Sequence, residues 1–153
     1  MSTEKTWQMH SRSSEDTEAL GERIGARLKG GEVIELVSDL GGGKTTFTRG
    51  LVRGAGSPDR VASPTFTVVR QYDAPKLNIF HFDFYRLDDP GIIVDELREY
   101  LSDPWTVVVV EWSDVVREVL PKNRTTITIS AVGETERAID CTFSPKFSYL
   151  FPH

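Results

Sequence analysis

Apolar residues along this chain recur with two different spacings, which indicates that helices and strands alternate. After a polar start, a cap at Ser13 or Ser14 opens the first helical segment, which closes near Gly30 and Gly31. Its apolar positions lie four residues apart, at Leu20, Ile24 and Leu28. Because this spacing places them on one face, we expect an amphipathic helix here.

Short runs rich in β-branched and aromatic residues predict strands between the helical segments. The run EVIELV predicts a strand over 32–37, and a glycine-rich turn leads from it into a helix with Phe47 and Leu51 on one face. Further strands are expected at 66–72, 78–85 and 106–112, and further helices at 90–103 and from Ser113 to just before Pro121. The runs at 125–132 and 137–143 flank a GETE turn and predict a hairpin. This order of elements indicates an α/β fold.

The composition is typical of one folded unit. The chain has 153 residues, of which 39% are apolar and 27% charged, and this content can close a single core. No internal repeat or long linker divides it, so we expect one domain over 1–153. The aromatic-rich segment at about 144–153 is expected to be a loosely attached tail, whose aromatic side chains either pack on the domain or dock a partner.

Charge and cysteine content narrow the range of functions. The formal net charge of −5 provides no broad positive field, so we expect no unaided binding of RNA or DNA. The single cysteine, Cys141, excludes an internal disulfide, and His10, His81 and His153 are too scattered for a zinc motif. The longest aliphatic run, 107–110, is too short to cross a bilayer. We therefore expect a cytoplasmic protein that does not act at a membrane.

A phosphate-binding loop follows the strand at 32–37. The pattern G-x-x-x-x-G-K-[ST] is met, except at its first glycine, by Ser38, Asp39, Leu40, Gly41, Gly42, Gly43, Lys44 and Thr45. Backbone N–H groups from Asp39 to Thr46 are expected to surround the phosphates of ATP at the positive end of the following helix. Lys44 is expected to reach the β- and γ-phosphates, and the Thr45 hydroxyl is expected to bind Mg²⁺. Together with the strand order, this predicts a P-loop NTPase-like three-layer sandwich with a mostly parallel central sheet and a C-terminal antiparallel hairpin.

Ser38 replaces the glycine that opens the pattern. If this position needs a positive φ, a serine there costs about 1 kcal/mol and loosens the loop without removing it.

Two carboxylates end predicted strands, where a phosphate loop needs an acidic partner. Glu111 ends the run VVVVE, and Asp83 ends NIFHFD. Either one could face Mg²⁺ or orient water, and either one could instead be a solvated carboxylate at a strand end. His81 lies on the same face of its strand as Asp83, and we expect it to be a packed, hydrogen-bonded residue and not a proton carrier.

A polar turn lies between the loop helix and the strand that ends at Asp83. Within it, Ser63 and Thr65 flank Pro64. A Thr65 hydroxyl that reached the γ-phosphate or Mg²⁺ would make this turn a switch, ordered by triphosphate and released on hydrolysis. An ordinary capped turn explains the same residues.

Four motifs together resemble the TsaE family, the P-loop ATPases of bacterial tRNA threonylcarbamoyladenosine biosynthesis. They are DLGGGKTTFTRGL, SPTFTVV, HFDFYRL and VVVVEWSD, in this order. The resemblance implies that Lys44 and Thr45 are phosphate and Mg²⁺ ligands, that Thr65 is a switch residue, and that Asp83 and Glu111 form the acidic pair. It also implies that Trp112 lies close to the nucleotide and that Thr17 and Arg137 border its adenosine. The chain departs from the family pattern at three positions, Ser38, Gly42 and Ser113.

The resemblance further implies a role in threonylcarbamoylation of the tRNA adenosine beside the anticodon. In the family, the TsaD subunit, paired with TsaB, handles the carbamoyl chemistry, and TsaE binds them and hydrolyses ATP to support turnover. Contact with tRNA is then expected only indirectly, which agrees with the acidic composition. Hydrolysis by the chain alone is expected to be slow.

Two other functions use the same loop. A small nucleoside or metabolite kinase would need a lid, but no arginine-rich lid segment is present, and only Arg86 and Arg137 are suitably placed to stabilise a transferring phosphoryl group. A nucleotide-gated binding module with negligible hydrolysis would use the same ligands and differ in how well water is oriented.

Overall fold

The computed structural model of the chain describes residues 4–38, 43–61, 69–85 and 91–152. The strands in it are β1 (Lys5–Ser11), β2 (Val33–Ser38), β3 (Val69–Asp73), β4 (Asn78–Asp83), β5 (Thr106–Glu111), β6 (Thr125–Ala131) and β7 (Arg137–Phe143). The helices are α1 (Ser14–Gly25), α2 (Lys44–Gly54) and α3 (Ile93–Leu101), with 3-10 segments η1 (Ser113–Val119) and η2 (Pro145–Leu150).

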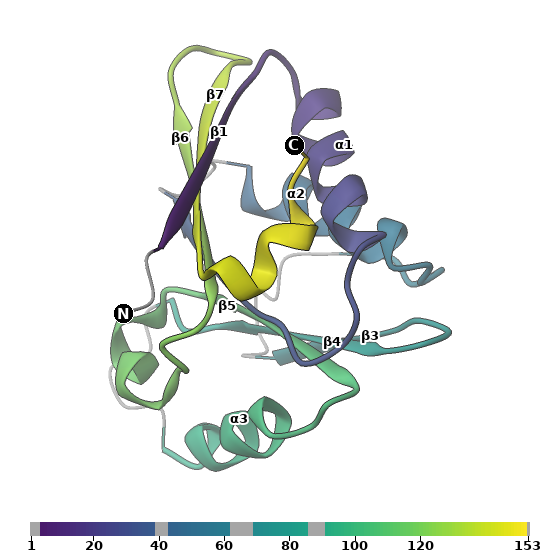
Figure 1. Cartoon of the computed structure of the whole chain (residues 1–153), viewed down its shortest axis with the longest axis vertical. Coiled ribbons are helices and arrows are strands. Elements are labelled where there is room, and N and C mark those ends of the chain that lie inside the picture. The colour runs from purple at the N-terminus through teal and green to yellow at the C-terminus, as the bar shows by residue number, and fades with distance from the viewer. Residues whose placement is uncertain (1–3, 39–42, 62–68, 86–90, 153) are drawn as a thin grey trace.

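All seven strands join one sheet in the order β1-β7-β6-β2-β5-β4-β3 (Figure 1). The four central strands, β6, β2, β5 and β4, run parallel to one another. The outer strands are antiparallel, and β6 and β7 form the C-terminal hairpin. The expected α/β fold with a mostly parallel centre and a C-terminal antiparallel hairpin is therefore confirmed.

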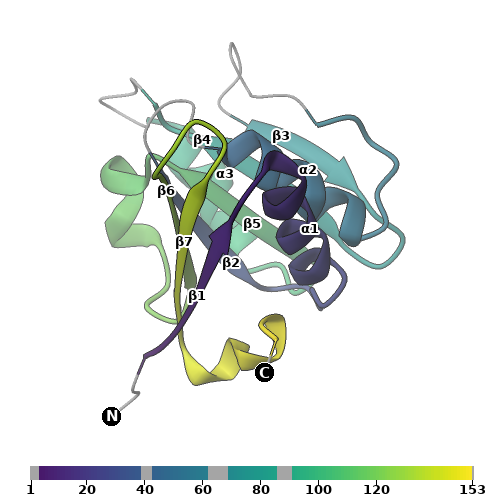
Figure 2. The ribbon, with the colours of Figure 1, turned by 90° about the horizontal axis from the view of Figure 1, so that it is seen from above.

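Helical segments cover both faces of the sheet, which gives three layers (Figures 1 and 2). All six residues of β5 are buried, and alternate ones enter different clusters of the core. Val107 and Val109 join the cluster that includes residues of α1 and α2. Val108 and Val110 join the cluster that includes residues of α3 and η1. This is the burial on two faces that an uninterrupted apolar strand predicts.

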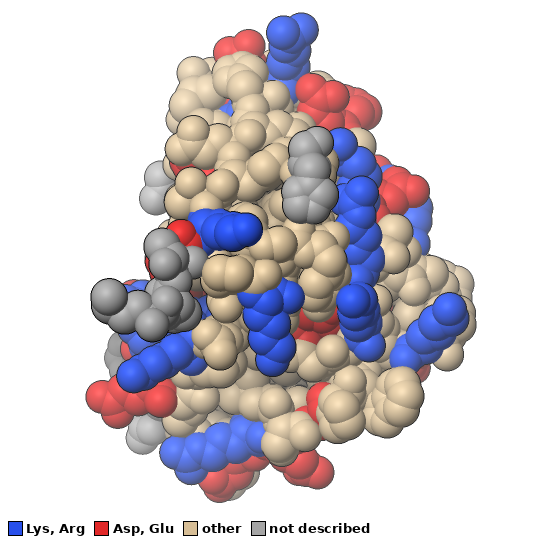
Figure 3. Space-filling view, in the orientation of Figure 1, with Lys and Arg blue, Asp and Glu red and all other residues tan. Residues whose placement is uncertain are grey.

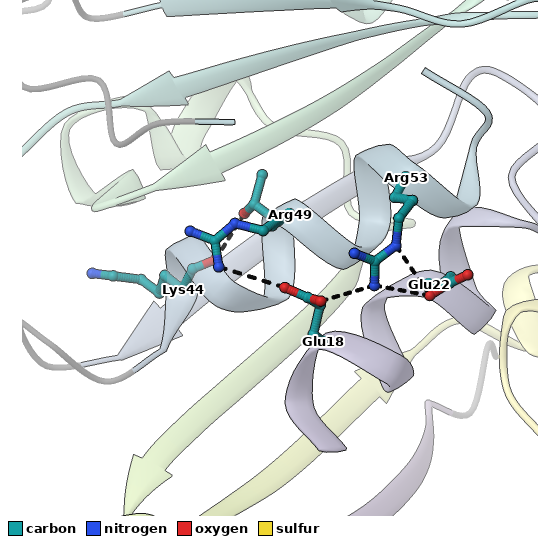
Figure 4. A network of polar contacts seen from close by, with 6 residues as sticks. Glu18, Glu22, Lys44, Arg49 and Arg53 are labelled. Atoms are coloured by element: carbon teal, nitrogen blue, oxygen red, sulfur yellow. Dashed lines mark hydrogen bonds and ion pairs between the residues drawn. The ribbon is translucent and has the colours of Figure 1, made fainter. Parts of the chain in front are cut away.

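Four glycines bring α1 and α2 into close contact. A Cβ atom added to any of them would lie between 2.0 and 2.3 Å from a backbone carbonyl oxygen of the other helix; they are Gly21 and Gly25 of α1 and Gly50 and Gly54 of α2. Arg53 also contacts Glu18 at 2.8 Å and Glu22 at 3.0 Å, while Arg49 contacts Glu18 at 3.5 Å. Figure 4 shows Lys44 at the start of α2 with its ammonium directed away from this network. The close glycine contacts and the ion pairs fix helix α1 to α2, the helix that follows the phosphate loop.

The N-terminal part of the chain differs from the sequence-based expectation in two ways. The segment regarded as a polar start forms β1, because alternation of Trp7 and Met9 with polar residues supplies one apolar face for the edge of the sheet. The following helix ends at Gly25, so Leu28 lies beyond it and packs against the core from the loop. The cap is Ser13, whose side chain accepts a hydrogen bond from the N–H of Asp16.

The C-terminal segment packs into the core over residues 145–151, so it is not loosely attached there, and its aromatic side chains pack on the domain, which is one of the two outcomes that the sequence predicts. Phe147, Leu150 and Phe151 are buried in the cluster shared with α1 and α2. The Tyr149 hydroxyl donates a hydrogen bond to Glu32, which holds the segment to the start of β2.

Among the described residues, no helix has the length and apolar character that crossing a bilayer requires.

Candidate functional site

The site forms at the edge of the sheet where β2, β5 and β4 end. Since these strands are parallel neighbours, their last residues, Ser38, Glu111 and Asp83, are brought to the same edge. Glu111 shares the face of β5 that carries Val107 and Val109, and that face is covered by α2. The sheet order therefore places the Glu111 carboxylate beside the start of α2.

Lys44, the first residue of α2, is the centre of the cluster. Its ammonium lies 3.5 Å from Glu111 Oε1 and 3.4 Å from the carbonyl oxygen of Ser38. The ring of Trp112 covers the ammonium, with 4.5 Å from Nζ to the ring centroid. Only 9% of the Lys44 side chain and 6% of the Glu111 side chain are exposed. The cation is thus held by partners in a partly dry site, where its charge acts more strongly than in water.

His81 fixes the second oxygen of Glu111. Its Nε2 is hydrogen-bonded to Glu111 Oε2, and both side chains are buried. Burial alone would raise the pKa of Glu111, but the His81 hydrogen bond and the charges of His81 and Lys44 outweigh it and lower the pKa. Glu111 therefore remains an anion inside the protein. His81 is the packed, hydrogen-bonded residue that the sequence predicts, and its partner is the carboxylate of the site.

Asp83 lies beside Glu111 in the register of β4 and β5. Its Oδ1 accepts a hydrogen bond from the N–H of Tyr85 at 3.0 Å. Burial raises its pKa, and the negative charge of Glu111 raises it further. Two neighbouring carboxylates that repel one another form a site in which a cation would be favoured.

A second part of the site is a hollow of about 160 Å³ beside the N-terminus of α2. Its lining residues come from the start of α1, the start of α2 and the β6–β7 turn: Ser13, Ser14, Thr17, Gly43, Thr46, Glu134, Thr135 and Arg137. Gly43 has a φ of 107°, a left-handed conformation that glycine adopts without cost. The Thr17 hydroxyl is 2.7 Å from Ser11 Oγ, which links this wall to β1. Thr17 and Arg137 are distant in sequence, and folding brings both to the phosphate-loop helix.

The remaining predicted residues are placed as follows. Thr45 and Thr46 lie in the first turn of α2, and Trp112 follows β5 directly. Ser38 is the last residue of β2 and does not have a positive φ, so the expected strain at this position is absent. The other predicted loop and switch residues, Asp39, Leu40, Gly41, Gly42, Ser63 and Thr65, lie outside the described residues.

The residues in place are compatible with Mg²⁺ bound together with a nucleotide. Within the described ranges, no three or more His, Cys, Asp or Glu side chains are grouped so that they could hold a metal by themselves. Mg²⁺ does not need such a cage, because it commonly uses one or two carboxylates together with substrate phosphates and water. Asp83, Glu111 and Thr45 carry side-chain oxygen atoms of the kind that such a site uses.

Sequence reasoning missed one polar group behind the site. Glu35 of β2 is buried, and its carboxylate accepts hydrogen bonds from Ser113, Arg124 and Thr126. A lone Glu inside an apolar strand was the available signal, because a buried carboxylate requires partners.

Comparison with known proteins gives consistent matches over most of the chain. The model of the family described as "Threonylcarbamoyl adenosine biosynthesis protein TsaE" matches residues 11–139. The TsaE protein of Bacillus subtilis is 40% identical over 84% of this chain and 80% of its own length. The TsaE protein of Treponema pallidum is 34% identical over 84% of this chain and 95% of its own length. The crystal structure of YdiB from Bacillus subtilis has a TM-score of 0.80 at 32% identity and covers 98% of this chain and 94% of that one.

Proposed function

The chain belongs to the TsaE family, and from this premise we propose that it binds and slowly hydrolyses ATP in support of tRNA threonylcarbamoyladenosine modification. The relatives are named for biosynthesis of this modified nucleoside. We propose that the chain acts in the cytoplasm with a transferase complex of TsaB and TsaD type, which holds the tRNA. The adenosine that is modified would be the one beside the anticodon.

The observation that carries this proposal is the contact between Lys44 and Glu111 at 3.5 Å. It joins the first residue of the helix after a glycine-rich loop to the last residue of a neighbouring parallel strand. Phosphate-loop enzymes use this pairing of a lysine at the loop with a carboxylate at a strand end. A flexible glycine turn without a ligand would not require a buried lysine and glutamate at its mouth.

The contacts of Lys44 support a division of labour at the γ-phosphate. The ammonium would exchange its contact with Glu111 for the β- and γ-phosphates, because these carry more negative charge than one carboxylate. Glu111 and Asp83 would then be free to hold the metal and to orient the attacking water. Mg²⁺ bound with ATP would neutralise charge that develops on the phosphates. His81 would keep the Glu111 carboxylate in position during this exchange.

The hollow beside Gly43 supports placing the nucleoside next to Thr17 and Arg137. It opens from the same helix N-terminus that would bind the phosphates, so one nucleotide could reach both regions. Its wall contains a guanidinium and the Thr46 side chain, which suit the polar sugar.

Hydrolysis by the chain alone is proposed to be slow. Lys44 is the one lysine or arginine paired with Glu111 within the described residues, and its charge is already shared with Glu111. A further cation or a well-placed donor at the γ-phosphate commonly supplies a large part of the rate in such enzymes. A partner surface would provide or organise that group.

A reconstituted modification assay tests the proposed function. Purified TsaB and TsaD, tRNA, ATP and the threonylcarbamoyl donor are combined with this chain, without it, or with a variant that lacks Lys44. We expect repeated turnover only with the intact chain, together with release of phosphate. Equal amounts of modified tRNA in all three mixtures would reject the proposal.

A further inference from the structure

Trp112 has a backbone conformation that is unfavourable for its side chain. It is the one described non-glycine residue with a positive φ, at φ 55° and ψ 54°. Bulky residues rarely adopt this left-handed region, because their Cβ then crowds the backbone. The conformation turns the indole toward the site, where it covers the Lys44 ammonium and packs on Tyr85 with 4.9 Å between ring centroids. Surrounding contacts must therefore hold this residue in place.

The residues on both sides of Trp112 are anchored by buried polar contacts. On one side, Glu111 is fixed by His81 and Lys44. On the other side, the Ser113 hydroxyl donates a hydrogen bond to Glu35 Oε2, and both residues are at most 5% exposed. The turn between β5 and η1 is thus held from two directions, and Trp112 lies between the two anchors.

Glu35 connects Ser113 to two further parts of the fold. Its Oε1 accepts hydrogen bonds from Thr126 Oγ1 at 2.9 Å and from Arg124 Nε at 3.2 Å. Arg124 also donates to the carbonyl oxygen of Pro121 at 3.0 Å, near the start of the loop that follows η1. Glu35 lies three residues before the end of β2, the strand that leads into the phosphate loop. One carboxylate therefore joins β2, β6 and η1.

Glu35 and the cluster of Lys44, Glu111 and Asp83 lie on opposite sides of β2. Ile34 and Leu36 point into the core on the side of α2, so Glu35 points to the opposite side of the sheet. None of its hydrogen bonds involves Lys44, Glu111 or Asp83. The hydrogen bond to Ser113 links Glu35 to the turn that carries Trp112.

We propose that Glu35 and Ser113 are positioning residues that hold Trp112 over Lys44 before a nucleotide binds. The indole is then in place when the ammonium moves from Glu111 to the phosphates, and no binding energy is spent on ordering the turn. This inference rests on the proposed ATP site. It adds a specific determinant of affinity in Glu35, whose side chain lies on the face of β2 opposite to that of Ile34 and Leu36.

The test uses the indole of Trp112 as its own probe. The full-length chain is prepared with Trp7→Phe and Trp105→Phe, so that Trp112 is its single tryptophan. Acrylamide quenching of its fluorescence is measured without nucleotide, and ATP affinity is measured by calorimetry. Ser113→Ala should raise the quenching constant about two-fold and weaken ATP binding about 3- to 10-fold, the effect of one lost hydrogen bond.

Three further variants separate positioning from general loss of structure. Ser113→Thr keeps the hydroxyl and should retain the quenching and affinity of the parent. Glu35→Gln keeps an acceptor but loses the charge and should fall between parent and Ser113→Ala. Ser148→Ala removes a hydroxyl that bonds to the Pro145 carbonyl oxygen, away from the site, and should change neither readout.

Unchanged quenching in Ser113→Ala, or a loss in Ser113→Thr as large as that in Ser113→Ala, would overturn the positioning role. If the parent itself binds no ATP, the proposed function fails. The quenching comparison without nucleotide then still decides whether Glu35 and Ser113 order Trp112.

Discussion

At the scale of single residues, Lys44 is the strongest test of the site. Lys44→Ala should weaken binding of ATP by about 2–5 kcal/mol, because the phosphates would lose a cation in a partly buried setting. Titration calorimetry with ATP measures this directly. Lys122→Ala, at an exposed lysine of the loop before β6, is the matched control and should bind as wild type does. Equal affinity of Lys44→Ala and wild type would remove the phosphate-loop assignment.

The acidic pair gives a second prediction at this scale. Glu111→Ala and Asp83→Ala should each lower the rate of ATP hydrolysis about 100-fold or more, since both carboxylates are proposed to hold the metal or orient water. Binding of ATP should be retained, because the lysine and the loop remain. Steady-state phosphate release and calorimetry separate the two effects. Asp95→Ala, at an exposed carboxylate of α3, serves as control, and a rate near wild type in both acidic variants would contradict their roles.

At the scale of elements, the contact between α1 and α2 depends on glycines that have no room for a side chain. A Cβ on Gly50 would lie 2.0 Å from the carbonyl oxygen of Glu18, a backbone atom that cannot move away by rotation. Gly50→Ala should lower the free energy of unfolding by about 3 kcal/mol or more through overpacking. Gly133→Ala is the control, because there the added atom meets only the side chain of Glu136. Urea unfolding of both variants and of the wild type measures this loss of stability. Equal stability of Gly50→Ala and wild type would show that α1 and α2 can move apart at no cost.

The link between β2, β6 and η1 should make stability depend on pH. The Glu35 pKa is lowered: burial opposes ionisation, but hydrogen bonds from Ser113 and Thr126 and the charge of Arg124 outweigh it. A lowered folded pKa means that the stabilisation is complete above the ordinary value of 4.5 and is lost as pH falls through the folded pKa. Glu35→Gln should therefore cost about 1–3 kcal/mol at pH 7.

The difference in unfolding free energy between wild type and Glu35→Gln should shrink as pH falls below 4.5. Denaturant unfolding at a series of pH values measures it, and other carboxylates cancel in the comparison because both chains carry them. A difference that stayed constant from pH 7 to pH 3 would mean that the carboxylate is not stabilised as an anion by its partners.

At the scale of the whole molecule, charge predicts the division of labour with partners. The net charge is −5, although Figure 3 shows several Lys and Arg side chains on the face that carries α1 and η2, with Asp and Glu around its rim. tRNA alone should neither bind tightly at physiological salt nor stimulate hydrolysis. The TsaB–TsaD pair should change the hydrolysis rate.

Filter binding with labelled tRNA and phosphate release with and without the pair measure both effects. Tight binding of tRNA by the chain alone would contradict the prediction and would direct attention to the face with α1 and η2. A hydrolysis rate that the pair leaves unchanged would remove the proposed partnership.

The sequence by itself determined the features that depend on neighbours along the chain. The glycine-rich loop before Lys44, the apolar strand that ends at Glu111 and the hairpin around the GETE turn follow from residue spacing and local turn chemistry. These features were sufficient for the fold class and for the candidate residues Lys44, Glu111 and Asp83. The edge strand β1 was missed because half-exposed alternation over a few residues resembles a polar loop.

The tertiary structure decided which of these features meet. Lys44 contacts Glu111, 67 positions later in the sequence, only because β5 lies next to β2 in the sheet. Thr17 and Arg137 share a hollow because glycines fix α1 to α2, and Glu35 reaches Ser113 because alternation directs it to the other face. Spacing along the chain does not encode the order of strands in a sheet. That order is set by the burial of both faces and by the pairing of backbone hydrogen bonds across the whole domain.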